Sequence, residues 1–224
     1  MPTCYDLNHI VNTKRMDWHT LIESQGFLEF IPGDLRKVTE RRNIAAGEML
    51  FRAGSSVCYL YCLLSGEVRL VRHDASGGRI VLQRSRGGFI AEASIDSKTY
   101  HCDAVAAENT RLLCFPLSEF LHALEGNAHF RTMWMALLAR EVRKLRTRCE
   151  RLSLHNAGER IVHYLESEGA DGVLTLSQSR KAWAEELGLS HEALYRTLKK
   201  LAGQGRLKIE GKTISLLRSS DYQY

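Results

Sequence analysis

The sequence lacks the features of a membrane or secreted protein. No run of about 18 apolar residues occurs, which is the length that a helix needs to cross a bilayer. The N-terminal segment carries the charges of Asp6, Lys14, Arg15 and Asp17 in place of the apolar core and small-residue cleavage site of a secretory signal. We therefore expect a soluble protein that resides in the cytoplasm.

The six cysteines lack any pairing pattern. They form no C-x-x-C pair and have no histidine partner at the spacing of a zinc finger. Cysteines in a reducing cytoplasm stay as thiols, so a disulfide framework is not expected. The sequence therefore predicts free thiols at Cys4, Cys58, Cys62, Cys102, Cys114 and Cys149.

Catalytic motifs are missing too. The chain has no nucleophile elbow, no phosphate-binding loop and no metal-binding motif. Glu92, His101 and Asp103 supply acid and base groups. On an extended strand, however, His101 and Asp103 point one way and Cys102 the other, so these three side chains cannot converge on a ligand without a second element. We predict that the protein is not an enzyme and binds no metal.

Charge is distributed unevenly along the chain, whose net charge is +5. From Gly126 to Tyr224, 17 Lys and Arg stand against 11 Asp and Glu, which gives +6. The remaining residues have 14 against 15, which gives −1. The basic excess thus lies in the C-terminal half and indicates an anionic partner there.

Short apolar segments separated by glycines make up the region from about Glu40 to Phe115. Apolar and polar residues alternate around Val68 and Leu70, as in half-buried strands. Gly77 and Gly78 predict a tight hairpin turn, because glycine tolerates the positive φ that such turns require. Many short strands with glycine corners are typical of an antiparallel roll or barrel.

One long helix is predicted from Asn127 to Leu152, with a length of about 39 Å. Its apolar residues follow spacings of three and four and form one narrow stripe. A long helix buries such a stripe efficiently only against a similar helix, so we predict that the stripe is the interface of a homodimer. Packing on the chain's own roll is the alternative. The stripe consists of Trp134, Leu138, Val142, Leu145, Cys149 and Leu152.

Shorter helices are expected on both sides of the roll. Residues 17–30 have the pattern of a short amphipathic helix, and Ser118 and Asn156 are suited to cap two further helices. The face of the long helix opposite the apolar stripe is expected to be exposed and basic. Its cations are Arg140, Arg143, Lys144, Arg146, Arg148 and Arg151.

A helix-turn-helix pattern lies near the C-terminus. Helices are expected at 178–187 and 191–202, and Gly188 would make the turn between them. Ala184 allows the two helices to approach, and Ser190 supplies an oxygen that caps the second helix. Two strands, at 206–210 and 213–217, would follow as a wing.

DNA bases would be met by the outer face of the second helix, near its N-terminus. Arginine can donate two hydrogen bonds to guanine, and a carboxylate can accept one from cytosine. The residues on this face are His191, Glu192, Tyr195 and Arg196.

In these features the chain resembles the bacterial cyclic-AMP receptor protein and fumarate-nitrate regulator (CRP/FNR) superfamily. The resemblance begins at about Ile44 and rests on three motifs and the long helix. The motifs are Gly47-Glu48-x-Leu50-Phe51-x-x-Gly54, Leu64-Ser65-Gly66-Glu67-Val68-Arg69-Leu70, and Leu187-Gly188-Leu189-Ser190-x-Glu192-x-x-x-Arg196 followed by Leu201.

The resemblance implies an α+β fold and a homodimeric transcription regulator. We expect a sensory β-roll of the cyclic-nucleotide-binding type at 1–126, a dimerisation helix at 127–153 and a winged helix-turn-helix at 154–224. Double-stranded DNA with a pseudo-palindromic site and RNA polymerase are the implied partners. Tyr195 departs from the small residue often found at its position in the family.

The resemblance also implies how the C-terminal residues divide their work on DNA. The positions matching His191, Glu192 and Arg196 read bases in the major groove. Contacts to the DNA backbone are expected from Ser179, Arg180, Ser190, Lys199 and Lys212.

The effector is not identified by these motifs. Relatives that bind cyclic nucleotides carry Gly-Glu and then Arg-Ser, because the cyclic phosphate needs a charge-assisted partner. Here Ala91-Glu92 matches the first pair, and no arginine lies between Arg86 and Arg111, so binding of cyclic AMP is disfavoured. The residues expected to line an effector pocket are Glu92, Ala93, Ser94, His101, Cys102 and Leu145.

Several signals stay open at this point. A small molecule, a gas bound at haem, a thiol redox change and a roll that needs no effector are all compatible with the motifs. Pro2 fits the haem-binding relatives, but Ala93 stands near the position of their histidine. An iron-sulfur cluster is disfavoured, because Cys4 is alone in the N-terminal segment. A cyclic-nucleotide-binding module that acts on a protein partner is the rival function.

Overall fold

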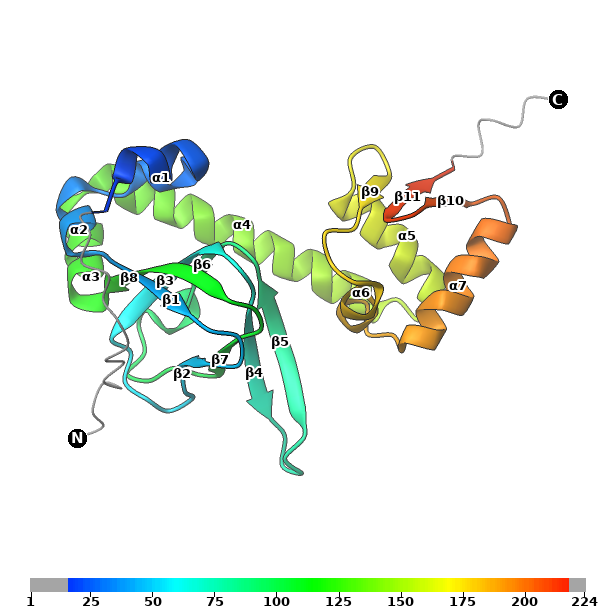
Figure 1. Cartoon of the computed structure of the whole chain (residues 1–224), viewed down its shortest axis with the longest axis horizontal. Coiled ribbons are helices and arrows are strands. Elements are labelled where there is room, and N and C mark those ends of the chain that lie inside the picture. The colour runs from blue at the N-terminus through cyan, green and yellow to red at the C-terminus, as the bar shows by residue number, and fades with distance from the viewer. Residues whose placement is uncertain (1–15, 218–224) are drawn as a thin grey trace. The chain divides into compact units, whose positions relative to one another are not determined.

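A computed structural model of the chain describes residues 16–217 (Figure 1). The chain divides between Met135 and Ala136 into two compact units, the N-terminal unit and the C-terminal unit. The predicted three-part division at residues 126 and 153 stays a prediction. Within residues 16–217, no helix combines the length and the apolar character that a bilayer crossing requires.

The described part of the N-terminal unit begins with two short helices and a 3₁₀ turn: α1 (Trp18–Ser24), η1 (Gly26–Phe30) and α2 (Gly33–Val38). Asp17 caps α1, since its Oδ1 accepts a hydrogen bond of 3.0 Å from the backbone N–H of His19. The single helix predicted at 17–30 is therefore wrong, because the chain leaves α1 at Gln25 and continues as a 3₁₀ turn.

Two antiparallel four-stranded sheets form the body of the N-terminal unit and confirm the predicted roll (Figure 1). One sheet has the order β1-β8-β3-β6, with bounds Glu40–Ile44, Thr110–Pro116, Tyr59–Ser65 and Gly88–Ile90. The other has the order β2-β7-β4-β5, with bounds Met49–Phe51, Asp103–Ala106, Val68–His73 and Arg79–Ser85.

The hairpin between β4 and β5 has a longer loop than a two-residue turn. Five residues separate the strands, and Oδ1 of Asp74 accepts hydrogen bonds from the backbone N–H groups of Ser76 and Gly78. Gly77 has φ +82°, so the glycine does supply the positive φ that the sequence predicted.

A cluster of aromatic rings closes the N-terminal unit beside the first sheet. Helix α3 (Leu117–Gly126) and the start of α4 (Ala128–Ser153) contribute Phe120, Phe130 and Trp134, which pack with Phe89 of β6. Asn127 caps α4 by accepting a hydrogen bond from the N–H of Phe130. Ser118 does not cap α3, because Pro116 occupies the cap position and the Ser118 hydroxyl bonds to Glu119 instead.

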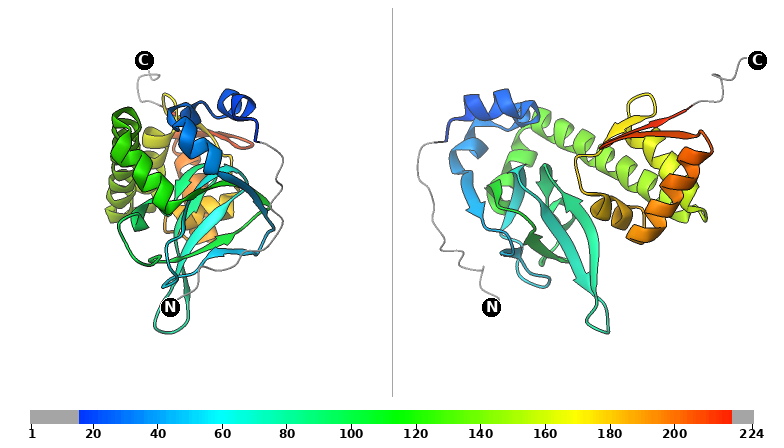
Figure 2. Two further views of the ribbon diagram at one scale, coloured as in Figure 1. Left: turned by 90° about the vertical axis from the view of Figure 1, so that its left-hand side faces the viewer. Right: turned by 45° about the vertical axis from the view of Figure 1, so that its right-hand side comes forward.

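Up to residue 217, the C-terminal unit consists of the rest of α4, three further helices and a small sheet, which Figure 2 shows from two more sides. The helices are α5 (Ala157–Glu168), α6 (Arg180–Glu186) and α7 (His191–Gly203). The sheet has the order β10-β11-β9, with bounds Leu207–Glu210, Thr213–Leu216 and Val173–Thr175. Asn156 caps α5 as predicted, by accepting from the N–H of Gly158.

The cysteines depart from the prediction at one position. Four of them, Cys62, Cys102, Cys114 and Cys149, are free thiols, whereas Cys58 is disulfide-bonded, so the prediction of a free thiol is wrong at Cys58. Cys4, like Pro2, lies outside the described residues.

Candidate nucleic-acid interface

The turn between α6 and α7 is built as a helix-turn-helix requires. Leu187 ends α6, and Gly188 follows with φ +65°, a left-handed conformation that favours glycine. The backbone N–H of Leu189 donates to the carbonyl of Ala184, which folds the chain back over the end of α6. Buried Leu194 of α7 joins Leu187 in the core between the helices, which fixes the angle at which α7 is presented.

The N-terminus of α7 is capped as predicted. The Ser190 Oγ accepts a hydrogen bond of 3.1 Å from the N–H of Ala193. Hydrogen bonds from its own backbone N–H and from the Ser190 hydroxyl lower the pKa of Glu192. Glu192 is therefore ionised at neutral pH in the first turn of α7, where the helix dipole favours a negative charge.

The four predicted base-reading residues share the exposed outer face of α7. His191, Glu192, Tyr195 and Arg196 are all exposed, and 52 % of the Tyr195 side chain is open to solvent. The rings of His191 and Tyr195 lie 5.5 Å apart between centroids, at an angle of 58°. Over less than two helical turns, this face therefore presents the Glu192 carboxylate as a hydrogen-bond acceptor, the Arg196 guanidinium as a donor and the broad ring of Tyr195.

The predicted phosphate-binding residues divide into two groups. Lys199 and Lys212 are exposed cations. Ser179 caps α6 by accepting from the N–H of Ala182, and Ser190 caps α7, so both hydroxyl oxygens are already engaged within the protein. Arg180 is half-buried, and its Nη2 donates a hydrogen bond of 3.1 Å to the carbonyl of Gly211.

The strands after α7 form the predicted wing. β10 and β11 pair antiparallel from Leu207↔Leu216 to Glu210↔Thr213, and Gly211 between them has φ +61°. The third strand, β9, extends the sheet through pairs such as Thr213↔Thr175. Because the wing sheet packs through Leu207 and Ile214 into the core that also holds α7, it is fixed relative to that helix.

The end of α4 is anchored in the C-terminal unit, which the sequence did not indicate. Arg151 is only 1 % exposed, so the prediction that it belongs to the solvated basic face is wrong. Its guanidinium lies 4.3 Å from the Tyr164 ring centroid and donates 2.8 Å hydrogen bonds to Ser167 and Glu168. The helical periodicity correctly placed Arg151 away from the apolar stripe. Periodicity cannot show, however, that α5 packs against this side of α4.

Arg160 is a second residue whose contacts were not evident from the sequence. Its Nε donates to the carbonyl of Leu154, and its Nη1 donates to the carbonyls of Leu187 and Gly188. One side chain therefore ties the segment after α4 to the turn of the helix-turn-helix. Its partners are all backbone carbonyls, so no pattern of side chains in the sequence could have revealed it.

The predicted dimer stripe needs one correction. Trp134 is 3 % exposed and packs edge-on against Phe89 and Phe120, at centroid distances of 5.0 and 4.9 Å, so it belongs to the core of the N-terminal unit. Met135, the next residue, is 64 % exposed. The remaining members lie partly or fully exposed along α4: Leu138, Val142, Leu145, Cys149 and Leu152.

The residues expected to line an effector pocket are only partly brought together. Ser94 and His101 meet at 3.0 Å between Oγ and Nδ1, and Glu92 begins the 3₁₀ turn η2 (Glu92–Ser94) that holds Ser94. Ala93, in contrast, is exposed. Leu145 belongs to the C-terminal unit, where it is 51 % exposed.

Cys102 and its neighbours do not converge on one point. Cys102 is 1 % exposed, and burial raises the pKa of its thiol to about 11, which makes it a weak nucleophile at neutral pH. Asp103 accepts a hydrogen bond from the N–H of Ala53 instead of facing His101. Within residues 16–217, no group of three or more His, Cys, Asp and Glu side chains is arranged to hold a metal ion.

Arg72 of β4 lies beside these residues, although the sequence analysis did not consider it. Its Nε donates a 3.0 Å hydrogen bond to the carbonyl of His101. The pairing of β4 with β7, with Val71 opposite Asp103, brings the two positions together across 29 residues of sequence. The segment between Arg86 and Arg111 contains no arginine of its own, but the Arg72 guanidinium contacts it from the neighbouring strand β4.

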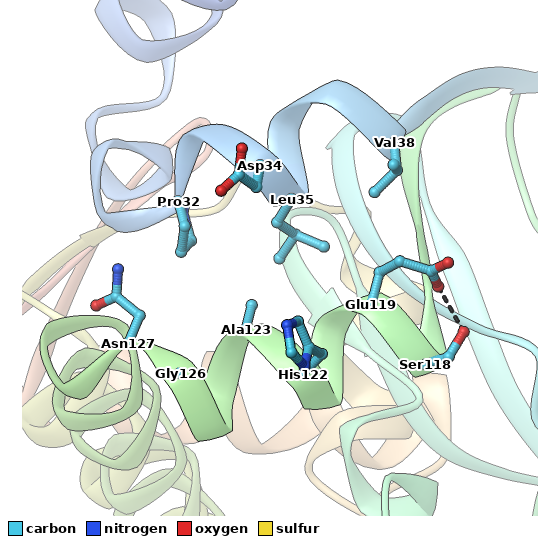
Figure 3. Close-up of a pocket in the computed structure, with 10 residues that line it drawn as sticks. All are labelled: Pro32, Asp34, Leu35, Val38, Ser118, Glu119, His122, Ala123, Gly126 and Asn127. Atoms are coloured by element: carbon cyan, nitrogen blue, oxygen red, sulfur yellow. Dashed lines mark hydrogen bonds between the residues drawn. The ribbon is translucent and has the colours of Figure 1, made fainter.

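A pocket of about 600 Å³ lies between α2 and α3, within the N-terminal unit (Figure 3). Pro32, Leu35 and Ala123 give it apolar walls, and Asp34 and Glu119 place carboxylates along it. None of the predicted effector-pocket residues lines this pocket.

Known proteins resemble the chain over most of its length. Residues 41–127 match the model of the cyclic nucleotide-binding domain. The transcriptional activator protein anr of Pseudomonas aeruginosa is 26 % identical over 191 residues, which cover 81 % of this chain and 78 % of that protein. The cyclic AMP receptor protein of Thermus thermophilus is 29 % identical over 180 residues, which cover 79 % and 83 %.

The fold is shared with solved structures of the same kind. FixK2 from Bradyrhizobium japonicum superposes with a TM-score of 0.63 at 23 % identity, covering 82 % of this chain and 94 % of FixK2. The Pseudomonas relative is a transcriptional activator, and the Thermus relative is a receptor for cyclic AMP. With the roll, the long helix and the winged helix-turn-helix in place, the chain is similar along most of its length to transcription regulators of the CRP/FNR type, and its roll matches a cyclic nucleotide-binding domain.

Proposed function

We propose that the protein is a homodimer that binds a specific pseudo-palindromic DNA sequence and is controlled by an effector or a redox signal sensed in the roll. The observation that carries this proposal is the outer face of α7. Four side chains of different hydrogen-bonding character stand exposed there, on a helix whose start is capped by Ser190 and whose angle is set by a buried core.

Each residue of this face has a chemical counterpart on a base edge. Arg196 can donate two bonds to the O6 and N7 of guanine, and the ionised Glu192 can accept one from the amino group of cytosine. His191 and Tyr195 flank them in the first turns of α7. Phosphates on either side would be bound by the exposed amines of Lys199 and Lys212 and by the helix start at Ser190.

The exposed apolar stripe of α4 fits a parallel pair of helices. With Met135 in place of Trp134, the stripe follows alternating spacings of three and four residues without interruption. One row of heptad positions holds Met135, Val142 and Cys149, and the other holds Leu138, Leu145 and Leu152. A β-branched residue such as Val142 in the first row, with leucine in the second, favours two-stranded parallel coiled coils. A twofold pair would set two α7 helices on successive major grooves, about 34 Å apart.

Charged residues beside the stripe support the same register. Glu141 and Arg146 occupy the two flanking positions of the heptad, so Glu141 of one helix would face Arg146 of the other. Within a single chain the Lys144 Nζ donates a hydrogen bond of 2.7 Å to Glu141, so the pair with Arg146 of the other helix would have to share or replace this bond.

The effector proposed for the roll is a small molecule, a gas or a redox change, and a cyclic nucleotide is the second candidate. The match to the cyclic nucleotide-binding domain and the name of the Thermus relative support the second candidate. Arg72 supports it too, because its guanidinium lies within hydrogen-bond distance of the His101 carbonyl, close to Ser94. Ultraviolet-visible and mass spectra of the purified protein test for haem and for retained nucleotides together.

The central test is the DNA itself. The purified protein is used to select binding sites from a pool of random duplexes, and the selected sequence is measured by gel shift with the wild type and with Arg196→Ala. We expect a pseudo-palindromic site, and we expect the variant to lose about tenfold or more in discrimination at one base pair of each half-site. A dimeric variant with unchanged site preference refutes the assignment of Arg196, and a wild type that selects no sequence refutes the proposed function. RNA polymerase is the partner proposed for the bound dimer.

A further inference from the structure

Arg180 connects three parts of the DNA-binding unit. It is the first residue of α6 and follows the cap residue Ser179. Its Nη2 donates a hydrogen bond of 3.1 Å to the carbonyl of Gly211, at the turn of the wing. Its guanidinium carbon lies 5.4 Å from the ring centroid of Tyr195, on the outer face of α7. The side chain therefore lies between the wing and the helix that faces DNA.

Tyr195 is contacted from two sides in this arrangement. The Arg180 guanidinium lies over its ring, and the His191 ring lies 5.5 Å away. Half of the tyrosine side chain stays exposed, so these two contacts restrict a ring that would otherwise be free to turn about its side-chain bonds. A side chain held in one orientation before binding loses less conformational freedom when the partner arrives.

The contacts of Arg180 distinguish two roles. As a phosphate contact it would need an extended side chain with donors directed at DNA. In the structure it is half-buried, one donor is engaged by Gly211, and its guanidinium lies over an aromatic ring. Lys181, the next residue, is exposed and is better placed to supply a simple positive charge.

We propose that Arg180 is a positioning residue that joins the wing turn and Tyr195 into one surface, and that this surface governs base preference. The proposal rests on the proposed function of α7 as the DNA-reading helix. The chemical counterpart of the restrained ring is the C5-methyl group of thymine, because apolar contacts with that methyl distinguish thymine in the major groove.

Lysine is the informative replacement. It keeps the positive charge that attracts a phosphate, but it has neither the flat face that covers an aromatic ring nor the fork of donors. If Arg180 positions Tyr195, Arg180→Lys has the same defect as Arg180→Ala. If Arg180 only neutralises a phosphate, Arg180→Lys resembles the wild type.

The experiment selects sites from a random duplex pool with the wild type, Arg180→Lys, Arg180→Ala, Tyr195→Ala and Tyr195→Phe. Lys181→Ala is the matched control for the loss of a neighbouring charge. We expect both Arg180 variants and Tyr195→Ala to lose preference at the same base pair of each half-site, by about fivefold per half-site, the size of an exposed cation–π contact. Tyr195→Phe keeps the ring and is expected to keep the preference. Adding Arg180→Ala to Tyr195→Ala is expected to cause no further loss.

Salt dependence supplies the second readout. Losing one phosphate contact in each subunit lowers the slope of log affinity against log salt by about 1.8. We expect no such change even for Arg180→Ala, which removes the charge. The circular dichroism spectra and unfolding midpoints of all variants are compared to show that they fold. If Arg180→Lys selects the wild-type sequence, or if Arg180→Ala weakens all sequences equally with a lower slope, the inference is wrong while the proposed function stands. If the wild type itself selects no sequence, the proposed function fails and the inference falls with it.

Discussion

Leu145 offers the most direct test of the dimer. In the described chain 51 % of its side chain is exposed, and this is the part that a partner helix would cover. Complete burial of a leucine side chain is worth about 1.5–3 kcal/mol, so covering half of it contributes about 1 kcal/mol per protomer and about 2 kcal/mol per dimer. Because 1.4 kcal/mol corresponds to a factor of ten, Leu145→Ala is expected to raise the dimer Kd about 30-fold.

Sedimentation equilibrium measures this dimer Kd directly, and a gel shift on the selected site measures its consequence for DNA binding. Leu121→Ala is the matched control, because Leu121 is also a partly exposed leucine on a helix but lies outside the stripe. The control is expected to leave the Kd unchanged. The reasoning is refuted if Leu145→Ala dimerises as tightly as the wild type, or if both variants weaken the dimer equally.

Three further outcomes are expected. Burial raises the pKa of Glu67, but hydrogen bonds from Arg69 and Arg86 outweigh this effect and hold the pKa below the ordinary value of 4.5. The Glu67 carboxylate therefore stabilises the fold above pH 4.5, and this stabilisation is lost as the pH falls towards the folded-state pKa. Glu67→Gln should make the unfolding midpoint depend less on pH in the acid range. Mild oxidation of the dimer should cross-link Cys149 to its counterpart, since equivalent heptad positions meet in a parallel pair, and a non-reducing gel that shows only monomer contradicts that register. Gly188→Ala should lower the free energy of unfolding by about 1–2 kcal/mol, because φ is +65° there; an unchanged urea midpoint would show that the turn adapts.

Local sequence patterns, such as alternating apolar residues and helix-capping side chains, predicted most of the helices and strands. Alternation and glycine corners gave the antiparallel roll, and the caps at Asn156 and Ser190 lie where a side-chain oxygen precedes a helical pattern. Two local predictions were wrong: a cap at Ser118, where Pro116 takes the position, and a single helix at 17–30. In both cases periodicity predicted a helix but not the residue at which that helix begins or ends.

Which face of a helix meets which neighbour could not be read from the sequence. Trp134 and Met135 both fit an apolar stripe with spacings of three and four, and the choice between them depends on Phe89 and Phe120, which are distant in the chain. Arg151 carries a charge, and charge normally indicates a solvated position. Its burial is compensated by the Tyr164 ring and by the hydrogen bonds that its Nη2 donates to Ser167 and Glu168, although its Nε has no hydrogen-bond partner within residues 16–217.

In the candidate DNA site too, the sequence indicated which residue types are present but not which groups they contact. The resemblance to CRP/FNR regulators predicted that Arg180 contacts the DNA backbone. Its bond to the carbonyl of Gly211 involves no side chain of the partner, and its contact with Tyr195 joins residues of two different helices. A basic residue in this unit can therefore act on DNA through the shape of the protein as well as through its charge, and the Arg180→Lys and Lys181→Ala pair separates these two effects because only the second variant removes a charge.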